Sequence, residues 1–183
     1  MSRIYQLKIT LVGSKPPIWR RFTVDSKITL DNLHYVIQEV MGWMDGHLHE
    51  YVSANGDRYG MVDEDDGDDY FAEVIDEGKT RLSDILKREK QKLSYCYDFG
   101  DGWEHQIVLE KMTEVDEENP RPKCLTGRNA CPPEDCGGIY GYYRLLEILA
   151  DPKNPQHEDM LEWVGDEIDP KEFDVDFVNE MLA

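Results

Sequence analysis

The sequence predicts an α+β fold, a largely antiparallel sheet with helices packed on one side and further helices at the C-terminal end. Two observations carry this prediction. Most segments between residues 5 and 112 alternate apolar and polar side chains, whereas helical apolar spacing dominates from residue 140 onward. No tandem repeat or domain-length linker is visible, so we expect residues 1–183 to form a single domain.

The first two strands form a predicted hairpin. Apolar residues recur at every second position of residues 5–11, which places them on one face of a half-buried strand. Pro16 and Pro17 end this strand, because proline gives no backbone N–H to a sheet. Residues 18–24 alternate again, and we expect them to pair with the first strand.

The clearest helix covers residues 29–42, where apolar residues follow helical spacing. Thr29 is a suitable N-cap, and Gly42 is suited to ending the helix. Alternation returns in residues 47–53, which predicts a third strand. Asn55–Gly56 is typical of a hairpin turn.

An acidic segment then interrupts the pattern. Residues 63–77 hold nine acids and no base, which predicts a solvated loop or insertion over residues 57–79. Residues 80–89 have the apolar spacing of a short amphipathic helix. Residues 92–112 read as two alternating strands, joined by a turn at Asp98–Gly102.

Three helices are predicted near the C-terminus, at residues 140–152, 154–165 and 169–182. Pro152 stops the first, and Gly165 follows the end of the second. The third would bury apolar residues that include Phe177 and Val178.

Composition excludes several classes of function. The formal net charge of −19 repels polyphosphate, so direct nucleic-acid binding is disfavoured. No apolar run approaches the ~18 residues of a membrane span, and the N-terminus lacks a signal-peptide core. We therefore expect a cytoplasmic protein with no membrane contact and with reduced thiols.

The cysteines offer a candidate metal site. Cys124, Cys131 and Cys136 supply three soft ligands within one loop, and thiolates suit Zn²⁺. A fourth ligand would come from His105, His157 or Cys96. The spacing lacks the CxxC pairs of standard structural zinc sites. The alternative is a turn built on prolines, with buried thiols acting as small hydrophobic groups.

A second candidate site combines aromatic and histidine side chains from neighbouring predicted strands. Aromatic groups with a few polar tips commonly line a cleft for a protein, peptide or small-molecule partner. We therefore expect a non-enzymatic binding module, with zinc as its candidate cofactor. The expected cleft residues are Trp43, His47, His49, Tyr97, Asp98, Trp103 and His105.

An alternative is a metal-dependent hydrolase. His47 and His49 lie two positions apart and would project from the same face of a strand. With His105 they would form a three-histidine metal site open to water. A polar cleft in which these histidines only stack and hydrogen-bond would give the same spacing.

Three long motifs resemble one known family. The stretches "YCYDFGDGWEHQIVLE", "CPPEDCGGIYGYYRLLEILADP" and "FDVDFVNEML" occur in the order of the plasmid pRi open-reading-frame-three-like family. The resemblance covers roughly residues 4–182 and implies a shared fold and an association with mobile elements. It carries over no catalytic residues. Some members have a resolvase-like label, but this chain ends in an acidic helix and lacks an activated serine among arginines.

Overall fold

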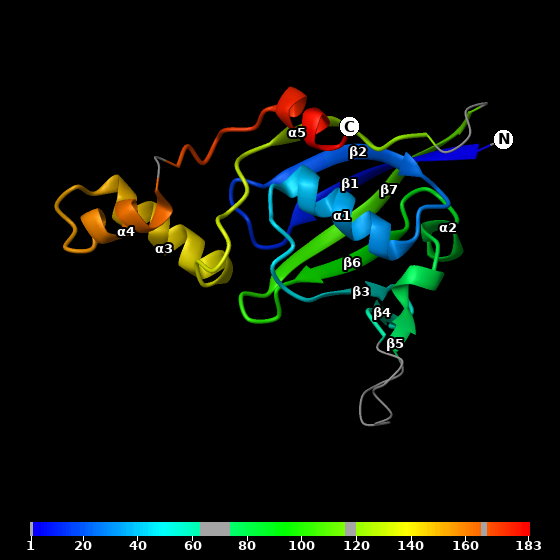
Figure 1. The fold of residues 1–183 in the computed structure, drawn as a ribbon, viewed down its shortest axis with the longest axis horizontal. Coiled ribbons are helices and arrows are strands. Elements are labelled where there is room, and N and C mark those ends of the chain that lie inside the picture. Colours follow the sequence, from blue (N-terminus) through cyan, green and yellow to red (C-terminus); the bar gives the residue numbers. More distant parts are fainter. Residues whose placement is uncertain (1, 63–73, 116–119, 166–167) are drawn as a thin grey trace.

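The computed structural model describes residues 2–62, 74–115, 120–165 and 168–183, and its strands form one eight-stranded sheet (Figure 1). The strand order is β5-β4-β3-β6-β7-β1-β2-β8, and neighbours run antiparallel except β4 and β5. The strands are β1 (Ser2–Leu11), β2 (Trp19–Asp25), β3 (His49–Ser53), β4 (Arg58–Gly60), β5 (Val74–Asp76), β6 (Lys92–Tyr97), β7 (Trp103–Val115) and β8 (Lys123–Arg128).

The helices confirm the predicted α+β class: α1 and α2 occur between strands of a mostly antiparallel sheet, and three further helices follow the last strand. Helix α1 lies over one face of the sheet, and the last helices lie beyond or beside it (Figure 1). The helices are α1 (Leu30–Met41), the 3₁₀ turn η1 (Glu77–Lys79), α2 (Leu82–Ile85), α3 (Gly138–Ala150), α4 (His157–Val164) and α5 (Val175–Met181).

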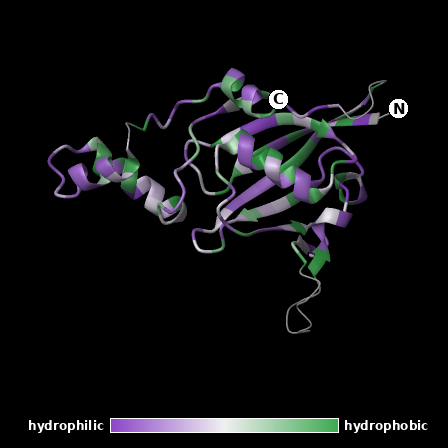
Figure 2. Ribbon diagram, viewed as in Figure 1, coloured by the Kyte–Doolittle hydropathy of each residue, from purple (hydrophilic) through white to green (hydrophobic). Residues whose placement is uncertain are grey.

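Alternation along the central strands produces the core. In β1, the four predicted inward residues Tyr5, Leu7, Ile9 and Leu11 are all buried. The strand pairs with β2 on one side and β7 on the other. Figure 2 shows hydrophilic and hydrophobic residues following one another along these strands. The predicted N-terminal hairpin is confirmed.

Helix α1 covers the buried face of the sheet. Its residues at helical spacing point inward, and Gly42 ends it in a left-handed conformation with φ of 102°. Thr29 occupies the cap position, but its side chain makes no capping hydrogen bond to the helix backbone. Its Oγ1 instead accepts from the Asn32 side chain at 2.7 Å. The inward apolar residues are Leu30, Leu33, Val36, Ile37, Val40 and Met41.

The acidic segment predicted over residues 57–79 is shorter than expected at both ends. β4 pairs with β3 across the predicted Asn55–Gly56 turn, and β5 extends the sheet beside β4. Glu77 is buried, because its carboxylate meets His49. The middle of the segment, residues 63–73, lies outside the described residues.

The C-terminal third differs most from the predicted boundaries. Part of the predicted cysteine loop is strand β8, which pairs with β2 at the edge of the sheet. Helices α2 and α5 are shorter than predicted, and Phe177 is 60% exposed rather than inward. Helices α3 and α4 pack together beyond the strand ends (Figure 1). Within the described ranges, no helix is long and apolar enough to cross a membrane.

Candidate functional site

The predicted aromatic and histidine residues come together on three neighbouring strands. The register aligns His49 with Tyr97, and Tyr97 with Trp103, across β3, β6 and β7. The next inward row aligns Tyr51, Tyr95 and His105 in the same way. The sequence therefore identified a real layer of side chains.

This layer is core, however, and not the open cleft that we expected. Trp103 and His105 are each only 1% exposed, and Tyr97 and Trp43 are buried with them. The Trp43 ring lies 5.8 Å from Trp103 and 5.2 Å from His105, between centroids. Because α1 and the following residues cover this face, the rings fill the space that a ligand would need.

His105 is an unusual member of this core. In the part of the chain that the structure describes, neither ring nitrogen meets a hydrogen-bond partner at suitable distance and angle. Burial lowers the pKa of His105 to about 3, so the imidazole is neutral at physiological pH. A buried, neutral imidazole is not available to substrate or metal from solvent.

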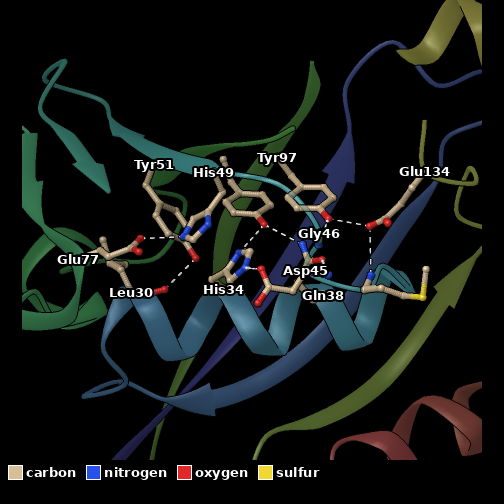
Figure 3. A network of polar contacts seen from close by, with 12 residues as sticks. Leu30, His34, Gln38, Asp45, Gly46, His49, Tyr51, Glu77, Tyr97 and Glu134 are labelled. Carbon is tan, nitrogen blue, oxygen red and sulfur yellow. Dashed lines mark hydrogen bonds and ion pairs between the residues drawn. The ribbon is translucent and has the colours of Figure 1, made fainter. Parts of the chain in front are cut away.

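His49 joins a second buried group, together with a residue that the sequence analysis missed. His34 of α1 stacks on His49, with ring centroids 3.5 Å apart and an interplanar angle of 4° (Figure 3). His49 Nε2 lies 2.8 Å from Glu77, and His34 Nε2 lies 2.7 Å from Asp45. Burial lowers the pKa of His34, which favours its neutral form.

A signal for this group was present in the sequence. His34 and Gln38 lie four positions apart within the apolar face of α1, where a polar pair indicates buried hydrogen bonds. Both side chains contact the Tyr95 hydroxyl, at 2.8 and 3.1 Å. These contacts stabilise the packing of α1 on the sheet.

Tyr97, the last residue of β6, brings the β6–β7 turn together with two other connecting segments at one end of the sheet (Figure 3). Its hydroxyl donates to Glu134 at 2.6 Å and accepts from the Gly46 backbone at 2.9 Å. Glu134 also accepts from the Met44 backbone N–H at 3.1 Å. The α1–β3 connection and the segment before α3 are thereby fixed against the end of β6.

His47, Asp98 and Asp135 meet beside this link, one from each segment. His47 Nε2 lies 3.7 Å from Asp98 Oδ2 and 3.2 Å from Asp135 Oδ1. One ligand atom from each residue lies within 4.8 Å of the other two, and the described residues contain no other such cluster of three His, Cys, Asp or Glu. His47 and Asp98 were predicted as site residues from the sequence, whereas Asp135 was not.

The three-histidine site is not formed. β3 begins at His49, so His47 precedes the strand and does not share its face. His47 contacts the two aspartates, His49 contacts Glu77, and His105 is enclosed by aromatic rings. The hydrolase alternative that depended on His47, His49 and His105 therefore has no geometric basis.

The three predicted cysteine ligands do not form a cluster in which all three sulfur atoms lie within 4.8 Å of one another. Cys124 is buried in β8, with its sulfur 3.8 Å from the Arg21 carbonyl oxygen, while Cys136 Sγ lies 3.9 Å from the Gly138 carbonyl oxygen. Burial raises the pKa of all three thiols, that of Cys136 to about 12. Buried thiols with a raised pKa fit the alternative of small hydrophobic groups, and zinc at this position stays a prediction.

An open apolar surface lies next to the aspartate cluster. A groove of about 480 Å³ runs between α3 and α4, and one of about 390 Å³ lies between α4 and the α1–β3 connection. Asp135 and Trp163 line both grooves. We call residues 138–164, which comprise α3, α4 and their connection, the arm.

The comparisons with known proteins agree with this fold. The chain matches the family described as plasmid pRiA4b ORF-3-like protein over residues 3–177. The chain belongs to this family. The pRiA4b ORF-3-like relatives include the uncharacterized protein y4hQ of Sinorhizobium fredii (strain NBRC 101917 / NGR234), which is 39% identical over 167 residues, 90% of this chain and 82% of y4hQ.

A solved structure is similar over almost its whole length. It is the crystal structure of MM3350, a protein of unknown function from Methanosarcina mazei Go1, with a TM-score of 0.84 and 37% identity. The match covers 96% of this chain and 97% of MM3350. The sheet, the covering helix and the C-terminal helices therefore belong to a fold that a solved structure shares.

Proposed function

We propose that this protein is a binding module that holds an apolar segment of a partner protein, flanked by lysine or arginine, in the two grooves of the arm. One observation carries the proposal. None of the eight residues of α4 is buried, although the helix has the apolar spacing of a packed element. Trp163 is 48% exposed at the junction of the grooves.

The floor of the groove between α3 and α4 is suited to apolar side chains. Leu145, Ile148 and Met160 line it together with Trp163. Leu145 and Ile148 are themselves buried, whereas Leu161 and Trp163 of α4 are exposed. Exposed apolar side chains on one helix indicate a surface of interaction, because water-exposed apolar area is unfavourable. A tryptophan at the centre of such a patch is a typical anchor for a partner.

The charge of α4 favours a basic partner protein over a second copy of this chain as the occupant of the grooves. Helix α4 carries Glu158, Asp159 and Glu162 and no lysine or arginine, within a chain of formal net charge −19. A second copy would bring the same acidic helix to the interface, and like charges would repel. A partner with basic residues beside its apolar side chains is attracted instead.

Fluorescence anisotropy with labelled synthetic peptides tests this, in buffer containing EDTA. One peptide carries leucine and phenylalanine flanked by lysines, a second has the same centre flanked by glutamates, and a third has serines between the lysines. We expect saturable binding of the first, with the other two at least about tenfold weaker. Equal binding of the first and third would show charge attraction alone and would contradict the proposal.

Two variants locate the binding surface. Trp163→Ala should weaken binding of the first peptide at least about tenfold, as loss of an interface tryptophan does. Phe177→Ala is the matched control, because Phe177 is similarly exposed on α5, away from both grooves. Light scattering measures whether the protein is a dimer. If it is, and if Trp163→Ala converts the dimer to a monomer, the grooves bind a second copy and the proposal is contradicted.

A further inference from the structure

We infer that His47, Asp98 and Asp135 form a binding site for a divalent first-row metal cation such as Zn²⁺ or Mn²⁺. The inference does not depend on the proposed partner binding, although Asp135 also lines the grooves. Its basis is the convergence of three ligand types from three connecting segments that are far apart in the sequence.

One of the three distances matches those around a single ion, and a second is slightly longer. Two ligand atoms about 2.1 Å from a metal, at tetrahedral or octahedral angles, lie about 3.0–3.4 Å apart. His47 Nε2 lies 3.2 Å from Asp135 Oδ1 and 3.7 Å from Asp98 Oδ2. The third separation is within 4.8 Å, and the Asp135 side chain is 70% exposed, so it has room to move inward.

Asp98 provides an independent indication that something binds here. Its side chain is only 10% exposed, and its Oδ1 accepts from the Gly100 and Asp101 backbone N–H groups. Within the described residues, Oδ2 takes part in no hydrogen bond and faces His47 at 3.7 Å. Oδ2 is the oxygen of this nearly buried carboxylate that keeps contact with solvent, so a cation can reach it there.

The surrounding structure holds these ligands in place. Tyr97, adjacent to Asp98, fixes the segments of His47 and Asp135 through its contacts with Gly46 and Glu134. The turn that carries Asp98 also contacts the start of α3. There Gly138 is required, because a Cβ at this position would lie 2.3 Å from the Asp101 carbonyl oxygen. Such fixed supports favour metal binding by reducing the reorganisation that binding needs.

The ligand set indicates the type of metal. One imidazole with two carboxylates suits Zn²⁺ and Mn²⁺, whereas Mg²⁺ and Ca²⁺ prefer oxygen ligands alone. Three protein ligands leave coordination positions for water or for a group of a bound partner. These positions would lie beside Asp135, where the two grooves meet.

Isothermal titration of the full chain, after EDTA treatment and dialysis, tests the site with ZnCl₂, MnCl₂ and MgCl₂. We expect one Zn²⁺ or Mn²⁺ per chain, bound at least about tenfold more tightly than Mg²⁺. His47→Asn and Asp135→Asn should each weaken that binding by about tenfold or more. Absence of heat with both ZnCl₂ and MnCl₂ would overturn the inference.

Asp45→Asn is the matched control. Asp45 also pairs with a histidine, has a positive φ of 55° like the 57° of Asp135, and lies outside the cluster. Its substitution should leave the metal affinity within about twofold. If His47→Asn and Asp135→Asn bind as tightly as the unmodified chain, the ion lies elsewhere and the inference fails.

Cobalt substitution separates this site from one on the cysteines. Co²⁺ bound by His47, Asp98 and Asp135 should show weak visible bands without the near-ultraviolet charge-transfer band of a thiolate ligand. A strong thiolate band that His47→Asn does not change would assign the metal to the cysteines. That result would also overturn the inference.

Discussion

Helices α1 and α4 are both amphipathic, but only α1 has its apolar face buried within the chain. Eight of the twelve residues of α1 are buried, whereas none of the eight residues of α4 is. Helix α1 lies over one face of the sheet (Figure 1). The aromatic side chains of that face are buried. Among the helices and strands that the structure describes, α4 packs mainly against α3, and grooves lie on either side of it.

This difference shows that the apolar face of an amphipathic helix predicts a contact but does not specify which surface it contacts. In α1 the stripe is matched by the inward faces of β3, β6 and β7, so its burial stabilises the domain. In α4 the stripe remains accessible beside carboxylates, so its burial is available to stabilise a complex. The core should therefore be sensitive to substitution and helix α4 tolerant.

The largest effect is expected in the core. Trp103→Ala should lower the free energy of unfolding by about 3–5 kcal/mol, because it removes a buried indole and leaves a cavity. Urea denaturation monitored by circular dichroism measures this change. Tyr35→Ala is the control, since Tyr35 lies on the exposed side of α1. A loss below about 1 kcal/mol for Trp103→Ala would contradict the assignment of this layer to the core.

An intermediate effect concerns pH. Burial lowers the pKa of His105 to about 3, so between about pH 6.5 and 3 the unfolded chain binds a proton that the folded chain does not. Stability from this group is complete above pH 6.5 and decreases as the pH falls. From pH 7.5 to 5.5 the loss should be about 1.4 kcal/mol.

Comparison with His105→Phe isolates this contribution from those of other groups, including His34, whose pKa is also lowered by burial. The variant should lose about 1.4 kcal/mol less than the unmodified chain over the same pH range, measured by urea denaturation. At pH 7.5 it should be at least as stable, because it removes two buried ring nitrogens that make no well-formed hydrogen bond, although backbone groups of Tyr95 and Trp103 lie near them. Parallel pH profiles would show that His105 is not enclosed as described.

Much of the core could be predicted from the sequence, because its signals are local. The alternation in β1 and the helical spacing in α1 identified both buried faces, and Gly42 marked the end of the helix. Strand β8 was missed, because its glycine and its proline-rich surroundings are typical of a loop. Gly127 is there for packing: a Cβ would lie 2.7 Å from the Phe173 ring.

The candidate site was predictable only in part, because its residues come together through contacts between distant parts of the sequence. His47 and Asp98 stood out beside aromatic residues, but Asp135 reaches them only because Tyr97 and Glu134 connect segments that are far apart in the sequence. The expected cleft was wrong for a related reason. Spacing showed that Trp103 and His105 share a face, and only the placement of α1 shows that this face is closed.

The smallest effect is expected in the arm. Trp163→Ala should change the free energy of unfolding by less than about 0.5 kcal/mol, since nearly half of the side chain is already exposed to solvent. The same urea denaturation measures it beside Trp103→Ala, so one residue type is compared in two environments. Because the two variants remove the same group, a difference between them reports packing and not the chemistry of tryptophan. A loss of about 3 kcal/mol or more for Trp163→Ala would place α4 in the core and leave no open surface for a partner.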